Sequence, residues 1–247
     1  MPGTRHLVWE GCFNARDLGG YPTEDGGETR YGFAVRSDDV SRLTDAGWRA
    51  AAEYGVRTIL DLRLAQDHRV APPADVPATA LHVSLLPDFG HPDWAEINAL
   101  AAASDPPDWM RVLYREFLDR YRQNFGRAIA AVANAESTVL VFCQFGKDRT
   151  GLISALMLRL AGVGVDTILA EYALSEERLR PFTEPWVARA ESEDERRQRL
   201  RVVATSASAM AEALAEVERL HGTVHAYLLE AGVPPDDLMR LRERLRA

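Results

Sequence analysis

The segment Cys143-Gln-Phe-Gly-Lys-Asp-Arg149 carries a cysteine and an arginine separated by five residues. A cysteine thiolate is a strong nucleophile, and an arginine guanidinium can hold two oxygens of a phosphate at once. A tight loop that ends at a helix N-terminus also points backbone N–H groups at an anion. The segment therefore predicts a phosphate site with its own nucleophile, in which Cys143 attacks phosphorus and Arg149 holds the phosphoryl oxygens.

The residues on either side of this segment favour the same interpretation. Thr138–Phe142 is a short apolar and β-branched run, which is typical of a buried strand. Residues 150–161 are apolar on nearly all sides, as in a helix at the centre of a domain. Cys143 would then lie at the carboxyl end of a strand, where open α/β sheets bind ligands. The helix dipole would favour its thiolate, and the Thr150 hydroxyl could donate a hydrogen bond to the sulfur.

The remaining patterns predict an α/β fold. Strands are predicted at Tyr31–Val35, Val56–Leu62 and Leu81–Leu86, and helices at Leu43–Tyr54 and along residues 113–132. This alternation indicates a central, mostly parallel sheet flanked by helices, and residues 180–247 would add a helical C-terminal part. We expect one domain over residues 1–247, in which segment 87–109 is a lid or an insert with a short helix.

Composition narrows the class of protein. Of the 247 residues, 47% are hydrophobic and 27% charged, as in ordinary globular proteins, and the net charge is −8. An acidic chain without a basic run argues against binding of nucleic acid. Cys12 and Cys143 are the only cysteines, which excludes a disulfide framework. No apolar run reaches the ~20 residues of a membrane span or begins the chain as a signal peptide. A cytoplasmic location is expected, with secretion by another route left open.

At the cysteine loop the sequence resembles the bacterial tyrosine-phosphatase family whose loop reads HC-x-x-GKDRTG. The resemblance extends beyond the loop. Asn14–Gly20 resembles the N-x-RDLGG element of that family, Val35–Ser37 its short RS element, and Asp61–Arg63 its DLR element. Residues 221–242 resemble the closing helices, so the resemblance runs from about residue 8 to the end.

The resemblance implies a cysteine-phosphatase fold and a protein-tyrosine phosphatase that works through a phosphocysteine. Its substrates would be phosphorylated proteins or small phosphoesters, since phosphoserine, phosphothreonine and phosphoinositide substrates are also known in the family. No metal or cofactor is implied, because Arg149, Lys147 and backbone dipoles neutralise the dianion. Phosphate or vanadate would inhibit. The resemblance makes Lys147 a second cation at the phosphate, and the other residues lining the substrate would be Gln144, Phe145, Gly146 and Gly151.

The acid that protonates the leaving oxygen is open. The resemblance favours Asp148, which lies in the loop itself. Asp88 is the rival, because it follows a predicted strand on a connection that could move over the site. Asp61, at the end of another strand, is better explained as a partner of an arginine.

One departure from the family keeps an alternative function open. Phe142 precedes the nucleophile, where the family usually has a histidine that orients the loop and favours the thiolate. The alternative is a phospho-binding pseudophosphatase with weak or no turnover, and sulfur transfer at a rhodanese-like site fits the loop less well.

Other residues with reactive or aromatic side chains have plainer explanations. His221 and His225 lack the glutamate of a zinc motif, and Cys12 is expected to pack as a small apolar residue. Phe89, Trp94 and Trp109 would either cover the substrate or anchor their loop, and Arg16 with Asp17 would be either a buried pair or a wall of the site.

Overall fold

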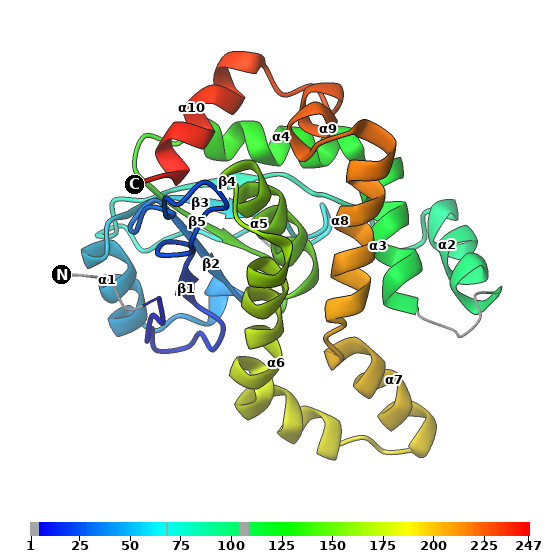
Figure 1. Cartoon of the computed structure of the whole chain (residues 1–247). Helices are drawn as coiled ribbons and strands as arrows, with labels where there is room; N and C mark the ends of the chain where they lie inside the picture. Colours follow the sequence, from blue (N-terminus) through cyan, green and yellow to red (C-terminus); the bar gives the residue numbers. More distant parts are fainter. Residues whose placement is uncertain (1–4, 68, 104–108) are drawn as a thin grey trace.

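The computed structural model describes residues 5–67, 69–103 and 109–247. Its centre is a five-stranded sheet in the order β1-β2-β5-β3-β4 (Figure 1). The strands span Arg16–Asp17 (β1), Ala34–Ser37 (β2), Val56–Asp61 (β3), Thr79–His82 (β4) and Thr138–Phe142 (β5). Strand β1 runs antiparallel to β2 and all other neighbours are parallel, which confirms the predicted mostly parallel sheet.

Strand β5 occupies the middle of the sheet because its five residues can all be buried. Successive side chains of a strand point to opposite faces. Val139 and Val141 accordingly join the larger core on one face, whereas Leu140 and Phe142 join a smaller core on the other. Both cores therefore meet at the strand that leads into Cys143.

Helices cover both faces of the sheet (Figure 1). They span Asp45–Glu53 (α1), Pro92–Ala103 (α2), Trp109–Arg120 (α3), Arg122–Ala133 (α4), Asp148–Leu160 (α5), Val165–Ala188 (α6), Glu193–Val203 (α7), Ala207–His221 (α8), Val224–Glu230 (α9) and Pro235–Leu245 (α10), with a 3-10 turn at Val40–Arg42 (η1). Helix α1 packs on the smaller core, and its start is capped by the side chain of Thr44, as predicted.

Helix α5 lies at the centre of the fold (Figure 1), and most of its residues belong to the larger core. Almost every side chain of α5 is buried, because the helix is apolar on all sides. Helices α4, α9 and α10 pack beside it, and α8 packs along α3. Helix α6 and helix α7 form a hairpin that projects away from the sheet (Figure 1). No helix in the described part of the chain is long and apolar enough to span a bilayer.

Some predicted boundaries were wrong. Strand β4 ends at His82, while Leu85 and Leu86 are buried outside the sheet, where Asn124 of α4 donates to the Leu85 carbonyl at 3.1 Å. The long helical pattern is two helices, because Tyr121 departs from helical dihedral angles and its hydroxyl bonds to Asp93. Segment 87–109 contains the twelve-residue α2, and its residues 104–108 lie outside the described ranges.

Candidate active site

The segment from Cys143 to Arg149 joins β5 to the first turn of α5 and carries the predicted nucleophile and phosphate clamp. Cys143 directly follows β5, and α5 begins at Asp148, so Arg149 lies in the first turn of that helix. Cys143 is buried, at 2% exposure. The predicted nucleophile and phosphate clamp therefore share one loop at the carboxyl edge of a parallel sheet, the edge where such sheets bind ligands.

Gly146 lets the loop pack tightly against the end of β2. Its φ of 59° lies in the left-handed region that glycine adopts without strain. A Cβ atom at this position would also come within 2.1 Å of the Ser37 carbonyl oxygen. The loop conformation therefore depends on glycine for both its backbone angle and its contact with β2.

Side chains from the scaffold hold two carbonyl groups of the loop. Asn14 donates from its amide nitrogen to the carbonyls of Phe145 and Gly146, each at 3.1 Å, and Arg36 donates to Gly146 at 2.6 Å. In a planar trans peptide the C=O and N–H groups point in opposite directions. The N–H groups of Gly146 and Lys147 therefore face the inside of the loop, as an anion cradle requires.

Glu171 of α6 fixes the arginines behind the loop. Its carboxylate pairs with Arg16 at 2.6 Å and with Arg36 at 2.7 Å, and all three side chains are at most 1% exposed. Ser175, one turn further along α6, accepts from Arg16 at 2.9 Å. Burial alone would raise the pKa of Glu171, but the two guanidinium groups outweigh it and lower the pKa below its usual value. Arg36 is thereby held in place to bind the loop.

A third buried arginine, Arg63, supports the first half of the loop. Arg63 pairs with Asp61 at 2.9 Å and with Asp39 at 3.1 Å. The backbone N–H of Asp39 donates in turn to the carbonyl of Gln144 at 3.3 Å. Asp61 is therefore engaged with an arginine, and the N–H group of Phe145 is turned inward by the same peptide geometry.

Phe142 is part of the packing that holds Arg63. Its ring is fully buried in the smaller core, on the face of the sheet opposite the core that includes Cys143. The Arg63 guanidinium lies 5.1 Å from the centre of the ring, within range of a cation–π interaction.

Replacing Phe142 by histidine is expected to destabilise the fold by about 1–3 kcal/mol, because it buries a polar ring beside a guanidinium. Urea denaturation of Phe142→His measures this cost. Phe142→Leu is the matched control, since it loses the ring but stays apolar and should lose less stability. A histidine variant as stable as the native chain would show that the imidazole finds a partner in this core.

The first turn of α5 carries Arg149 and Thr150. Arg149 is partly exposed, and its guanidinium donates to the carbonyl of Leu62 at 3.4 Å. Thr150 is fully buried, and its hydroxyl has no partner among the described residues. Arg149 is thus held near the end of β3, and the Thr150 hydroxyl keeps its hydrogen for another acceptor.

Lys147 contacts the connection between α7 and α8. It is 1% exposed, and its ammonium group donates to the carbonyls of Val202, at 3.0 Å, and of Ala204. The same nitrogen lies 3.4 Å from a carboxylate oxygen of Asp148. Lys147 was predicted to bind the phosphate. In the structure it holds the end of α7 and the residue after it against the loop.

The two candidate acids lie in different surroundings. Asp148 is partly exposed, and its Oδ1 atom accepts from the Tyr114 hydroxyl at 2.5 Å. Asp88 accepts instead from the backbone N–H of Gln66 at 2.9 Å, on the connection that follows β3. Asp148 therefore lies within the segment from Cys143 to Arg149. The carboxylate of Asp88 instead caps the neighbouring connection that follows β3.

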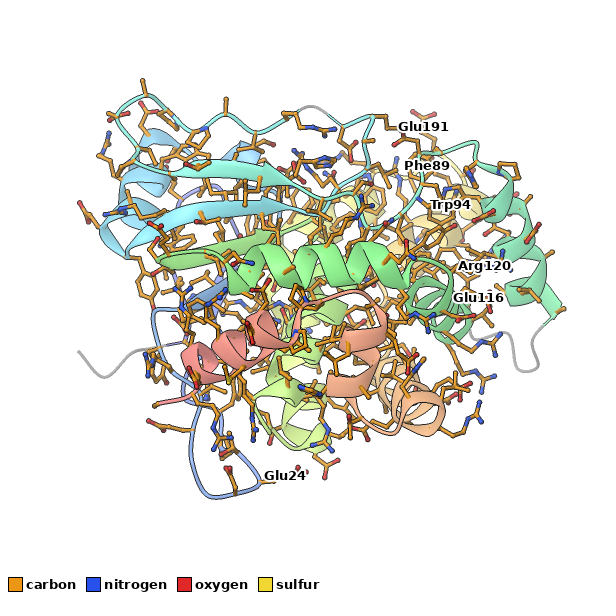
Figure 2. The ribbon with its side chains drawn as sticks, turned by 90° about the horizontal axis from the view of Figure 1, so that it is seen from above. Glu24, Phe89, Trp94, Glu116, Arg120 and Glu191 are labelled. Atoms are coloured by element: carbon orange, nitrogen blue, oxygen red, sulfur yellow. The ribbon has the colours of Figure 1, made fainter. Side chains whose placement is uncertain are left out.

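The aromatic residues of segment 87–109 have unequal roles (Figure 2). The Trp94 indole donates to the carbonyls of Pro87 and Asp88 at 3.2 Å, and its ring packs edge-on against Phe117. Phe89 is 70% exposed and lies against Trp94. Trp94 therefore anchors the connection that carries Asp88.

Cys12 differs chemically from Cys143. Burial, and then the charge of Asp38, raises the pKa of the Cys12 thiol to about 12, and the thiol lies 3.8 Å from the carbonyl oxygen of Asp39. A thiol with such a pKa stays protonated near neutral pH and is a poor nucleophile.

Arg16 and Asp17 do not pair with each other. Arg16 faces Glu171, whereas Asp17 accepts from the Tyr54 hydroxyl and from the N–H groups of Gly19 and Gly32. The two residues are successive in β1 and so point to opposite faces of the sheet.

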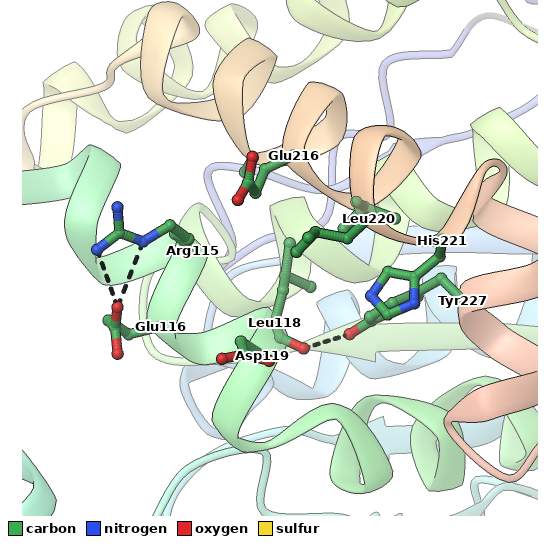
Figure 3. A pocket seen from close by; sticks show the side chains of 10 residues that line it. Arg115, Glu116, Leu118, Asp119, Glu216, Leu220, His221 and Tyr227 are labelled. Carbon is green, nitrogen blue, oxygen red and sulfur yellow. Dashed lines mark hydrogen bonds and ion pairs between the residues drawn. The ribbon is translucent and has the colours of Figure 1, made fainter.

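A pocket of about 300 Å³ lies apart from the cysteine loop (Figure 3). Helices α3, α8 and α9 line it with residues that include Glu116, Glu216, Leu220, His221 and Tyr227. His221 pairs with Glu230 at 2.8 Å, and the Tyr227 hydroxyl donates to the Leu118 carbonyl at 2.8 Å. These contacts account for His221 as a partner within the C-terminal helices.

Several residues of the site had no predicted role. Asn14 and Arg36 lie inside the elements that resemble the phosphatase family, so their motifs were a usable signal. Glu171 and Tyr114 lie in ordinary helical sequence, and no local pattern distinguishes them from other helix residues. Only their positions in the fold reveal that they support the loop.

The sequence is similar to those of known protein phosphatases. A sequence profile described as the tyrosine phosphatase family matches residues 7–247. The chain is 28% identical to the triple specificity protein phosphatase PtpB of Mycobacterium tuberculosis, over 94% of this chain and 96% of that protein. It is also 28% identical to a tyrosine-protein phosphatase of Nostoc commune, over 85% and 73% of the two chains. With the match covering nearly its whole length, the chain belongs to the tyrosine phosphatase family.

Proposed function

We propose that this phosphatase hydrolyses phosphotyrosine through a phosphocysteine intermediate on Cys143. The observation that supports this most directly is the loop from Cys143 to Arg149, whose carbonyls are bound from outside by Asn14, Arg36 and Asp39. Such a loop offers an anion inward-facing N–H groups, a helix N-terminus and a guanidinium at the same time.

The reaction would take two steps. In the first, the Cys143 thiolate attacks phosphorus in line, the bond from phosphorus to the ester oxygen breaks, and Asp148 gives its proton to the leaving oxygen. In the second, water attacks the phosphorus of the phosphocysteine, the phosphorus–sulfur bond breaks to return the Cys143 thiolate, and the proton that the water loses restores Asp148 as inorganic phosphate leaves. Arg149 would hold two phosphoryl oxygens in both steps, and Thr150 would donate a hydrogen bond to the departing sulfur.

The site supports a range of phosphomonoesters. Every proposed contact is made to the phosphoryl group or the leaving oxygen, so the loop by itself does not select the rest of the substrate. We include phosphoserine, phosphothreonine and phosphoinositides as further substrates, and one relative is named as a triple specificity phosphatase. Phosphate and vanadate are proposed as inhibitors because they fit the same cradle.

Phosphate release from a phosphotyrosine peptide in the presence of EDTA tests the proposal. Turnover that vanadate blocks is the expected result, because the mechanism uses no metal. Labelling by iodoacetate at pH 6, with mapping of the modified residue, is the companion measurement. Vanadate-protected labelling of Cys143 without turnover would instead indicate a phospho-binding protein, and activity that EDTA removes would contradict the mechanism.

A further inference from the structure

The carboxylate of Asp148 is held by a residue from outside the cysteine loop. Tyr114 of α3 places its hydroxyl 2.5 Å from Oδ1 of Asp148. Tyr114 is fully buried, and its ring packs edge-on against that of Tyr172 on α6. A buried aromatic side chain has little freedom to move, so this hydrogen bond fixes the direction in which the carboxylate points.

The hydroxyl groups of the two tyrosines form an ordered chain. The oxygen atoms of Tyr114 and Tyr172 lie 2.7 Å apart. A tyrosine hydroxyl has one hydrogen, and that of Tyr114 is given to the carboxylate of Asp148. Tyr172 must therefore donate to Tyr114, and the chain runs from α6 through α3 to the loop.

Both hydroxyl groups remain protonated and so remain donors. Burial, followed by the charge of Asp148, raises the pKa of Tyr114 well above its usual value. The same two causes raise the pKa of Tyr172. The chain therefore keeps its direction throughout the neutral pH range.

This arrangement gives the two carboxylate oxygens of Asp148 different surroundings. Oδ1 accepts from Tyr114 and lies 3.4 Å from the Lys147 ammonium group. Among the described residues no hydrogen bond or ion pair is made to Oδ2, and the Asp148 side chain retains 26% exposure, so a leaving oxygen can approach it. General acid catalysis depends on this geometry, because the acid must lie within hydrogen-bond reach of the leaving oxygen.

We propose that Tyr114, supported by Tyr172, is a positioning residue that orients Asp148 toward the leaving oxygen of the substrate. The inference rests on the proposed function, in which Asp148 is the acid. The hydrogen bonds that link Tyr172 of α6, Tyr114 of α3 and Asp148 would then serve catalysis. Packing of the two rings does not by itself require them.

Tyr114→Phe tests the inference because it removes one oxygen and keeps the buried ring. Two substrates separate the effects: a phosphotyrosine peptide, whose leaving group needs a proton, and an aryl phosphate whose phenol is acidic enough to leave without one. We expect kcat/KM for the peptide to fall by about 10-fold or more, because kcat/KM reports the step in which the leaving oxygen departs. For the aryl phosphate, kcat/KM should change by less than about 3-fold, because its leaving group departs without a proton from the acid.

A double variant identifies the residue through which Tyr114 acts. Asp148→Asn should show the same dependence on the leaving group as Tyr114→Phe, and adding Tyr114→Phe to it should change kcat/KM for the peptide by no more than about 2-fold. Tyr172→Phe is expected to have a smaller effect in the same direction. Tyr227→Phe is the matched control, because that buried hydroxyl donates to a backbone carbonyl elsewhere, and it should leave both substrates unaffected.

Failure of this inference can be distinguished from failure of the proposed function. Equal losses on both substrates, or losses that multiply in the double variant, would show that Tyr114 acts only through packing. Asp148→Asn with native activity on the peptide would overturn the inference by removing its acid. Inactivity of the native protein on both substrates would overturn the proposed function itself, and the inference with it.

Discussion

Replacing Cys143 by serine is expected to lower turnover of a phosphotyrosine peptide by about 10⁴-fold or more. A serine hydroxyl is far less acidic than a cysteine thiol, so it does not form an alkoxide near neutral pH. The change is nearly isosteric at this buried position. The fold and the phosphate cradle should therefore persist while the nucleophile is lost.

Two measurements on Cys143→Ser separate chemistry from binding. Phosphate release gives the loss of turnover, and calorimetric titration with the phosphopeptide or vanadate gives the affinity that remains. Affinity is expected to stay close to native for the peptide, since Arg149 and the backbone N–H groups are unchanged. Vanadate should bind more weakly, because it loses its bond to sulfur.

Cys12→Ser is the control for this variant. The pKa of Cys12 is raised to about 12, so the thiol takes no part as a nucleophile and its loss should leave turnover near the native value. A Cys143→Ser protein that kept a tenth of the native rate would refute the phosphocysteine mechanism, because another group would then be attacking phosphorus.

Replacing Glu171 by glutamine is expected to destabilise the protein by about 3–5 kcal/mol. The carboxylate is the anionic partner that the structure gives to both Arg16 and Arg36, and all three side chains are buried. Removing its charge leaves two guanidinium groups facing each other without compensation. Activity should fall as well, because Arg36 is the donor that holds the carbonyl of Gly146.

The effect of Glu171→Gln should depend on pH in a defined direction. The pKa of Glu171 is lowered in the folded state, so its charge stabilises the fold fully above its ordinary value of 4.5. This contribution is lost as the pH falls through the folded-state pKa. The difference in unfolding free energy between native and variant should therefore be constant near neutrality and shrink in acid.

Urea denaturation at pH 7 and at acid pH measures both effects. Glu176→Ala is the control on the same helix, because that side chain is exposed and its loss should change stability by less than about 0.5 kcal/mol. Equal stability of Glu171→Gln and native protein would mean that the two arginines are neutralised elsewhere.

Much of the fold followed from local patterns in the sequence. The strand Thr138–Phe142 was predicted with its observed bounds, because five buried apolar residues between turns have few other solutions. The helix after it and the cap at Thr44 were also predicted. Boundaries were wrong where tertiary packing competed with the pattern, as at Leu85 and Leu86, which are buried by α4 and its neighbours rather than by the sheet.

The chemistry predicted for the loop came from the sequence by itself, because Cys143, Gly146 and Arg149 are neighbours along the chain where a strand meets a helix. The sequence also indicated the short elements around Asn14, Arg36 and Asp61, but it did not show which residues they contact. In the structure Asn14 and Arg36 bind carbonyls of the loop, whereas Asp61 pairs with Arg63, which also pairs with Asp39.

Only the tertiary structure decided which side chains complete the site. Glu171 lies 135 positions from Arg36, Tyr114 lies 34 from Asp148, and Lys147 lies 55 from Val202. Such pairs have no sequence signal, since a charge or a hydroxyl within a helix looks the same whether it faces solvent or a partner. The partner is set by how α3, α6 and the α7–α8 connection pack around the loop, and that packing is a property of the whole chain.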